Sequence, residues 1–332
     1  MAISYLDIAG TFAGPGAYNY GVAAYPGGAQ LFVNSATGKD NSGRLNRIGQ
    51  GVLSASRNAQ GPYGDPSTPL ASIFGVNGAL SYCIANRGDT ILVAPGHSET
   101  LIASAVLTVP AGVTIIGGGY GNARPTIQQT IAANSITFGG SCQLQNLIFD
   151  LTGVASVVKG FLITTSGVQF NQCRFIQASV TNQATDCIVL NAGGDDCLIQ
   201  LCDFDATAAA GAARAISNPA ANNINRLQII NSQLHGNYSA QPISILSVGS
   251  AEFIIAENFL RNYNASFNVV GLAAGNTILG IISYNNIMMA GTGATNFISG
   301  GGGTGIALVQ NFAWDTKAST NSAALLPAVG IP

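Results

Sequence analysis

The stretch CQLQNLIFD at residues 142–150 decides the fold, because its pattern returns along the chain as a nine-residue frame. Successive copies begin 26 to 30 residues apart, and a shorter copy at residues 113–115 precedes them. We number the positions of the frame one to nine. The seven full copies begin at Cys142, Val168, Cys197, Leu227, Phe253, Gly280 and Ile306.

Two positions of the frame are apolar in every copy. Position three is occupied by Leu144, Phe170, Ile199, Ile229, Ile255, Ile282 and Leu308, and position eight by Phe149, Phe175, Phe204, Leu234, Leu260, Ile287 and Ala313. A repeat of this length, in which no part has the pattern of a helix, is typical of a right-handed parallel β-helix with three short strands per coil. We therefore expect an all-β, single-stranded solenoid of about eight coils. An antiparallel β-sandwich is the alternative, but it would not preserve so regular a ladder.

Position six predicts a second stacked column, at a corner of the coil. Three successive asparagines there can hydrogen-bond along the stack and tolerate the left-handed backbone of a sharp bend. The column consists of Leu147, Cys173, Cys202, Ser232, Asn258, Asn285 and Asn311. Further strands are expected between the frames, at residues 161–164, 187–190, 243–246, 268–272 and 296–298.

The composition of the 332-residue chain agrees with many short strands and excludes several classes of protein. Hydrophobic residues make up 47% and charged residues 8% of the chain, which excludes a disordered protein. The net charge is −2 with only 12 Lys and Arg residues, so we expect no nucleic-acid partner. No apolar run approaches the roughly 20 residues of a membrane helix, so no membrane partner is expected.

The compartment is predicted from the first residues and from the cysteines. Residues 1–7 do not resemble a secretory leader. The six cysteines form no CxxC pair and lie in apolar runs, which favours buried free thiols over disulfides and indicates folding in a reducing cytoplasm.

The front of the repeat region resembles a known family. GDTILVAPG at residues 88–96 and GVTIIG at residues 112–117 are similar to the entry rungs of pectin-lyase-like right-handed β-helices. More narrowly, residues 30–315 resemble the β-helix proteins found among the structural proteins of tailed bacteriophages. The resemblance implies the fold and an N-terminal capping helix, and it does not specify chemistry. A helix at about residues 68–87 fits, with Ser67 or Thr68 as its cap and Pro69 in its first turn.

We interpret the two ends of the chain as extended segments that flank the β-helix of residues 30–315. Residues 1–29 are rich in Gly, Ala and Tyr, and include Tyr18 and Tyr20. We interpret them as an extended arm, either ordered against a partner or flexible. Residues 37–66 are expected to form a long loop, and residues 300–303 a wide turn. The tail of residues 316–332 contains the apolar Leu325 and Leu326, so it is expected to cap the rod or contact a neighbour.

Candidate catalytic residues come from outward positions of the frame. Asp205, His235 and Arg261 occupy position nine in consecutive copies, so they would lie about 5 Å apart. Such a line can perform acid–base chemistry on a sugar, although a surface ion ladder is the simpler interpretation. Asp195 and Asp196 match the acidic pairs of pectin-degrading β-helices, but the rest of that catalytic pattern is absent, and a turn is the simpler role. We therefore expect no catalytic site, no metal and no cofactor.

Two further polar features have simple structural interpretations. Position seven places Arg174 beside Asp203, which predicts a salt bridge. His97 follows the turn at residues 95–96, where a histidine is expected to hydrogen-bond within the loop.

The outward positions two and four change from amide-rich to apolar toward the C-terminus. An exposed apolar strip of this kind usually marks an interface, although a loop of the same chain could cover it. Parallel rods packed around a threefold axis would bury the strip. The interface candidates are Ile230, Ile254, Ile281, Ala307, Val309, Trp314, Tyr18, Tyr20, Leu325 and Leu326.

These features favour a non-enzymatic bacteriophage virion protein. We expect a homotrimeric capsid decoration, or cement, protein on the particle surface, with the major capsid protein or other virion proteins as partners. The alternative is a receptor-binding tailspike or tail fibre that contacts a host surface glycan, with glycoside hydrolase or polysaccharide lyase activity as its enzymatic form. A secreted polysaccharide lyase is disfavoured by the missing catalytic pattern.

Overall fold

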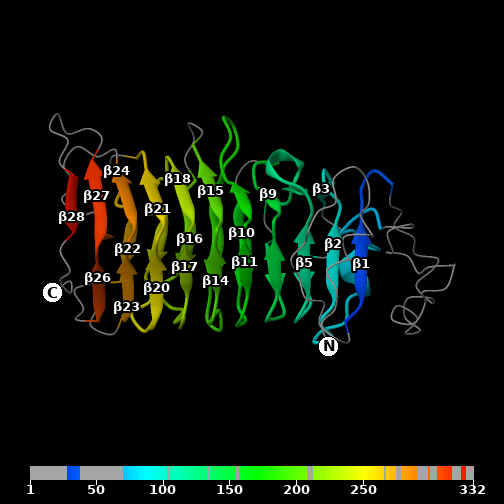
Figure 1. The fold of residues 1–332 in the computed structure, drawn as a ribbon, viewed down its shortest axis with the longest axis horizontal. Coiled ribbons are helices and arrows are strands. Elements are labelled where there is room, and N and C mark those ends of the chain that lie inside the picture. The colour runs from blue at the N-terminus through cyan, green and yellow to red at the C-terminus, as the bar shows by residue number, and fades with distance from the viewer. Residues whose placement is uncertain are drawn as a thin grey trace.

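The computed structural model shows a parallel β-solenoid (Figure 1). It describes residues 28–37, 70–102, 105, 107–132, 135–154, 157–207, 212–264, 267–273, 278–289, 298–299, 305–315 and 323–326. The coils stack along the long axis from β1 at one end to β27 and β28 at the other. The predicted all-β solenoid is therefore confirmed, and the β-sandwich alternative is wrong.

The strands of successive coils form three sheets, which we call sheets 1, 2 and 3 in chain order. Sheet 1 contains β1 (Gln30–Val33), β2 (Thr90–Val93), β5 (Thr114–Gly117), β8 (Gln143–Gln145), β11 (Gln169–Asn171), β14 (Leu198–Gln200), β17 (Gln228–Ile230), β20 (Phe253–Ala256), β23 (Gly280–Ser283) and β26 (Ile306–Val309). Sheet 2 contains β3 (Ser98–Leu101), β6 (Thr126–Gln129), β9 (Ile148–Asp150), β12 (Arg174–Ile176), β15 (Asp203–Ala206), β18 (Gln233–Gly236), β21 (Phe259–Asn262), β24 (Asn286–Met289), β27 (Asn311–Asp315) and β28 (Ala323–Leu326).

Sheet 3 lies between the end of one coil and the start of the next. Within the described residues it has eight strands, against ten in each of the other two sheets. They are β4 (Thr108–Val109), β7 (Ile136–Phe138), β10 (Val157–Ile163), β13 (Ala184–Leu190), β16 (Arg214–Asn218), β19 (Ile243–Ile245), β22 (Val270–Leu272) and β25 (Ile298–Ser299). The five strands expected between frames are found here with shifted ends, as β10, β13, β19, β22 and β25.

The register confirms both apolar columns. In sheet 1, Phe170 pairs with Leu144 on one side and with Ile199 on the other. In sheet 2, Phe175 pairs with Phe149 and Phe204 in the same way. These side chains are at most 1% exposed and belong to one continuous core. Burial of position three from sheet 1 and position eight from sheet 2 therefore fixes how each coil stacks on the next.

Position six also stacks, and its side chains act as hydrogen-bond donors inside the corner. The Nδ2 atoms of Asn258 and Asn285 donate to the carbonyl oxygens of Ile229 and Ile255, which lie at position three of the preceding coil. The Sγ of Cys173 makes the equivalent contact with the carbonyl of Leu144, at 3.4 Å. The predicted asparagine ladder is thus confirmed, and a thiol takes the place of the amide in the earlier coils.

The left-handed residue of this corner is at position five, not at position six as predicted. Position five has φ between 48° and 59° in all seven coils, at Asn146, Gln172, Leu201, Asn231, Glu257, Tyr284 and Gln310. Its N–H donates to position four of the next coil, as from Gln172 to the carbonyl of Gln200 at 3.0 Å. The ladder of hydrogen bonds therefore continues around the bend, which offsets the roughly 1–2 kcal/mol of the left-handed conformation.

The N-terminal cap is formed without the predicted α-helix. Among residues 70–87, the only helical element is a 3₁₀ turn, η3 (Ala79–Tyr82). The N–H groups of Ile73 and Phe74 donate to the carboxylate of Glu99 instead of to helix carbonyls, at 2.7 and 2.8 Å. Gly78 makes a tight turn in which a Cβ would lie 2.6 Å from the Ser72 Oγ. Leu70, Ile73, Phe74 and Leu80 are nevertheless buried, so the segment still covers the core.

Several predictions fall outside the described residues. These are the arm with Tyr18 and Tyr20, the loop of residues 38–66, the caps Ser67 and Thr68 with Pro69, and the turn at residues 300–303. At the other end, β28 pairs antiparallel with β27, so part of the C-terminal tail closes the edge of sheet 2 as predicted.

Candidate functional site

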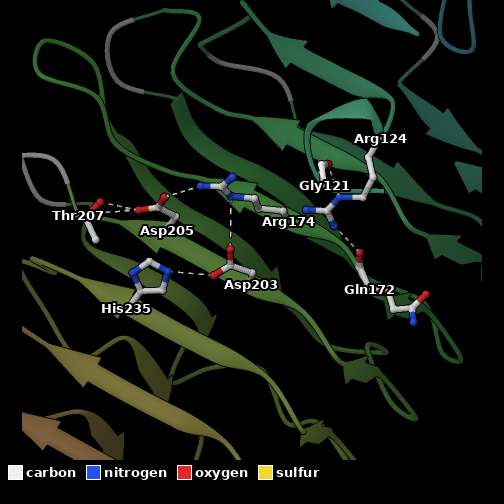
Figure 2. A network of polar contacts seen from close by, with 8 residues as sticks. All are labelled: Gly121, Arg124, Gln172, Arg174, Asp203, Asp205, Thr207 and His235. Atoms are coloured by element: carbon white, nitrogen blue, oxygen red, sulfur yellow. Dashed lines mark hydrogen bonds and ion pairs between the residues drawn. The ribbon is translucent and has the colours of Figure 1, made fainter. Parts of the chain in front are cut away.

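The outer face of sheet 2 carries the main cluster of charged side chains, on β12, β15 and β18 (Figure 2). Positions seven and nine both point outward here, because position eight is buried between them. The register places Arg174 beside Asp203, and Asp205 beside His235. Two neighbouring columns therefore bring one cation, two carboxylates and one imidazole together.

Arg174 contacts both carboxylates of the cluster. Its Nη2 lies 2.9 Å from an Oδ2 of Asp205, and its Nε lies 3.3 Å from the Oδ2 of Asp203. The salt bridge predicted between Arg174 and Asp203 is therefore confirmed. The three side chains are 18–35% exposed, so water screens these pairs, and each contributes at most about 1 kcal/mol to stability.

His235 hydrogen-bonds to a different carboxylate from the one that sequence register suggested. Its Nε2 lies 2.9 Å from the Oδ1 of Asp203, diagonally across the face, whereas Asp205 is its direct neighbour in the ladder. Asp205, His235 and Arg261 do lie on consecutive coils, as predicted. The three do not form one relay, because each side chain has a different partner.

Asp205 is held by the residue two positions after it. Its Oδ1 accepts hydrogen bonds from the N–H and the Oγ1 of Thr207, at 3.1 and 2.7 Å. Burial raises the pKa of Asp205, but the hydrogen bonds from Thr207 and Arg174 outweigh it and lower the pKa overall. Asp150 and Thr152 form the same arrangement at position nine two coils earlier. The Asp-x-Thr pattern was therefore a sequence signal for this turn, which the sequence analysis missed.

Arg261 is directed toward aromatic rings. Its Nη1 donates to the hydroxyl of Tyr263 at 2.9 Å, and its guanidinium carbon lies 4.7 Å from the centre of the Phe259 ring. Cation–π contacts of this kind fix the position of the guanidinium. Arg261 is therefore separated from the carboxylates that bind Arg174.

Arg124 adds a second cation near the cluster (Figure 2). It follows the 3₁₀ turn η4 (Gly121–Ala123), and its guanidinium donates to the carbonyls of Gly121 and Gln172. Burial, and to a lesser degree the charge of Arg174, lower its pKa. This arginine was not anticipated from the sequence, because a backbone carbonyl partner leaves no motif.

The geometry of the cluster suits a structural ion network better than general acid–base catalysis. A general acid needs a carboxyl group whose pKa is raised toward neutrality, whereas the pKa of Asp205 is lowered. Asp203 forms an ion pair with Arg174 and a hydrogen bond with His235. In the part of the chain that the structure describes, no three metal-ligating side chains come together.

The other predicted polar residues contact groups of the chain itself. Asp195 and Asp196 form a turn, in which the Oδ1 of Asp195 accepts the N–H of Asn225 at 2.6 Å. Asp196 has φ 55° and forms an ion pair with Arg226, which lowers its pKa. His97 is 2% exposed and accepts the N–H of Ser35 at its Nδ1. Ser35 lies 62 residues earlier, so this hydrogen bond does not lie within the loop of His97, contrary to the prediction.

Two buried acids, which the sequence analysis did not single out, organise the N-terminal end. Asp89 is fully buried and accepts the N–H groups of Ala29 and Ile84 together with a bidentate contact from Arg87. Glu99 binds the N–H groups of Ile73 and Phe74, as described above. Both carboxylates are satisfied by the chain, so they hold the cap in place.

The predicted apolar strip lies on the outer face of sheet 1. Ile281 is 43% exposed, Ala307 is exposed, and Ile230, Ile254 and Val309 are partly exposed. The register stacks Ile254 on Ile281 and Ile281 on Ala307. The side chains of Trp314, Leu325 and Leu326 lie outside what the structure describes.

All six cysteines are free, and five of them are buried. Burial raises the pKa of Cys197 to about 12. The five buried thiols are therefore core residues, as predicted, and Cys83 is only partly buried.

Comparison of the chain with protein-family models, with curated proteins and with solved structures found no match. Within the described residues, no helix is long and apolar enough to span a membrane. The fold and the surface together define the chain as a parallel β-solenoid with an ion network on sheet 2 and a partly exposed apolar strip on sheet 1.

Proposed function

We propose that the chain is a homotrimeric structural protein of the bacteriophage virion, which decorates and stabilises the head shell. The observation that carries the proposal is the apolar strip on sheet 1. Stacked coils align Ile254, Ile281 and Ala307 into a straight row along the rod. Leu279 and Tyr284, which are 46% and 55% exposed, widen the row on either side. A second rod laid alongside would remove this apolar surface from water.

The ion network on sheet 2 supports a structural role. Its carboxylates are occupied by Arg174, Thr207 and His235, so they stiffen the face. The phage assignment rests on the resemblance of residues 30–315 to the β-helix proteins of tailed bacteriophages. A receptor-binding tail protein is the alternative, and it would require glycan contacts on the particle surface.

Light scattering tests the trimer directly. The wild-type chain is expected to have a mass three times its 33.7 kDa. The double variant Ile254→Asp/Ile281→Asp should be monomeric, because buried carboxylates without partners oppose association. The matched control, Gln143→Asp/Gln169→Asp, places the same charges at position two of earlier coils and should remain trimeric. A monomeric wild type would overturn the proposed interface.

Electron microscopy of purified virions tests the location. Particles that lack this protein should lose a feature of the head surface and should release their contents at a lower temperature than wild-type particles. An unchanged head surface would reject the decoration role, and a missing tail feature would support the alternative.

A further inference from the structure

Two cysteines lie on adjacent coils in the corner column at position six. Cys173 and Cys202 directly precede Arg174 and Asp203, which are ladder partners on β12 and β15. The backbone also connects the two coils here, because the N–H of Asp203 donates to the carbonyl of Cys173 at 2.9 Å. Both cysteines belong to the core, at 0% and 2% exposure. The register therefore stacks two buried thiols.

The two thiols contact each other in the way that the asparagines of later coils do. In those coils, a side-chain oxygen at position six accepts the N–H of position six in the preceding coil, as Asn285 does from Asn258 at 3.0 Å. The Sγ of Cys202 takes the place of that oxygen, and it hydrogen-bonds to the backbone and to the thiol of Cys173. The thiol of Cys202 is therefore directed toward the coil that contains Cys173.

The spacing of the coils is compatible with a disulfide between these residues. Neighbouring strands lie about 4.8 Å apart, and disulfides join Cα atoms that are about 4.4–6.8 Å apart. The carbonyl contacts of the two thiols are long, at 3.4 Å from Cys173 to Leu144 and 3.3 Å from Cys202 to Gln200. A thiol is a weak donor, so little stability is lost when the two side chains rotate toward each other.

The surroundings of the pair favour reaction at Cys173. Burial raises the pKa of Cys173, but hydrogen bonds, chiefly from Cys202, and the charge of Arg124 outweigh burial and lower the pKa overall. Arg124 is fixed beside the corner, where its guanidinium donates to the carbonyl of Gln172 at 2.9 Å. Burial raises the pKa of Cys202 well above its usual value. A thiol that ionises readily, next to one that keeps its proton, is the arrangement from which a disulfide forms.

We infer that Cys173 and Cys202 are a redox-active pair, which a small peroxide converts into a disulfide between adjacent coils. The thiolate of Cys173 attacks hydrogen peroxide, the O–O bond breaks, and the products are a sulfenic acid and hydroxide. The sulfur of Cys202 then attacks the sulfenic sulfur, so that the S–S bond forms, the S–O bond breaks and a second hydroxide leaves. The two hydroxides take up the two thiol protons. Two thiols thereby lose two electrons, and the peroxide becomes two water molecules.

The disulfide stabilises the solenoid, because it cross-links two coils and restricts the unfolded chain. It forms outside a reducing compartment, where small thiols no longer reverse it. Reinforcement of a released virion by this bond rests on the proposed function. The cross-link itself does not, since it lies within one chain.

Mass spectrometry of the purified chain after treatment with hydrogen peroxide tests the inference. Remaining thiols are blocked with iodoacetamide, and proteolytic fragments are sequenced to locate the cross-link. The wild type is expected to lose two of its six free thiols, to join Cys173 to Cys202, and to recover both thiols in dithiothreitol. The urea midpoint of the oxidised chain should be higher than that of the reduced chain.

Cys173→Ser and Cys202→Ser should each abolish the cross-link. Both variants should fold, because the column already contains Ser232, whose hydroxyl accepts the N–H of Cys202 at 3.1 Å. Circular dichroism checks their fold.

Cys197→Ser is the matched control, because Cys197 is equally buried but has Val168 and Leu227 in its column on the adjacent coils. This variant should form the cross-link as the wild type does. The inference is overturned if the wild type keeps all its thiols, if Cys173 is joined to Cys187 instead, or if peroxide oxidises Cys173 to a sulfinic acid. None of these results changes the mass measured for the trimer, so the proposed function is tested separately.

Discussion

The two halves of the solenoid have the same coil but stabilise it with different interior side chains. In the N-terminal half, phenylalanines fill the core, and the rings of Phe175 and Phe204 stack at 4.6 Å. Phe161 meets Phe149 edge-on at 4.8 Å. In the C-terminal half, position eight is aliphatic, and the corner is held by Asn258, Asn285 and Asn311.

The comparison shows that position six can change along the rod while positions three and eight stay apolar. Where the rings stack, position six is filled by Leu147 and by thiols. Where position eight becomes aliphatic, position six is Ser232 and then an asparagine in each coil. The outer face of sheet 1 changes along the same axis, from the glutamines Gln143 and Gln169 at position two to the apolar strip. The outward columns can therefore specialise without disturbing the fold.

The largest effect is expected from the phenylalanine core. Phe175→Ala should lower the free energy of unfolding by about 3–5 kcal/mol, because it removes a fully buried ring that contacts several others and leaves a cavity. Urea denaturation followed by circular dichroism measures the change. Ile176→Ala, an outward change in the same strand, should lower it by less than about 1 kcal/mol. Similar losses in the two variants would contradict the stacked core.

The asparagine ladder should respond less strongly. Asn285→Ala removes the acceptor for the N–H of Asn258 and the donor for the carbonyl of Ile255. Two buried backbone groups then lack partners, so the free energy of unfolding should fall by about 2–4 kcal/mol. The adjacent exposed residue supplies the control, since Asn286→Ala should change stability by no more than about 0.5 kcal/mol. Equal stability of the two variants would show that the ladder contributes nothing.

The sequence predicted the parts of the fold that repeat in register. Position three, position eight and position six were found because each residue type returns at a fixed offset, and the strands of sheet 3 followed from the spaces between frames. β7 and β16 were not predicted, because the segments around them show no clear strand alternation. The left-handed position five was also missed, since residues as different as Leu201, Glu257 and Tyr284 occupy it and leave no pattern.

For the candidate site, the sequence predicted the column to which each residue belongs but not the partner that it contacts. Register placed Asp205, His235 and Arg261 on one face, but side-chain rotamers decide that His235 reaches Asp203 and that Arg261 turns to Phe259. The capping helix was expected from apolar residues at helical spacing, and the structure buries the same residues through bends. In both cases the residues were correctly placed, and the contact was decided by a partner distant in sequence, such as Glu99.

The smallest effect is expected from the ion network where the two halves meet, and unlike the effects of the core ring and the asparagine ladder it should depend on pH. Neither the rings nor the asparagines titrate. The pKa of Asp205 is lowered in the folded state, so its stabilising contribution is present above the unfolded pKa of about 3.9 and is lost as the pH falls through the folded value. Asp205→Asn should therefore reduce stability by less than about 1 kcal/mol at pH 6 and have no effect near pH 2.

Asp186 on sheet 3 is the matched comparison, because its pKa is shifted in the opposite direction from that of Asp205. Burial raises its pKa despite the nearby Arg214, so its contribution is present at low pH and is lost as the pH rises through the folded value. Relative to wild type, Asp186→Asn should therefore gain stability with rising pH, while Asp205→Asn loses it. Urea midpoints measured between pH 2 and pH 7 test both variants. If the urea midpoints of both variants shift in the same direction with pH, the hydrogen bonds from Thr207 and Arg174 do not lower the pKa of Asp205.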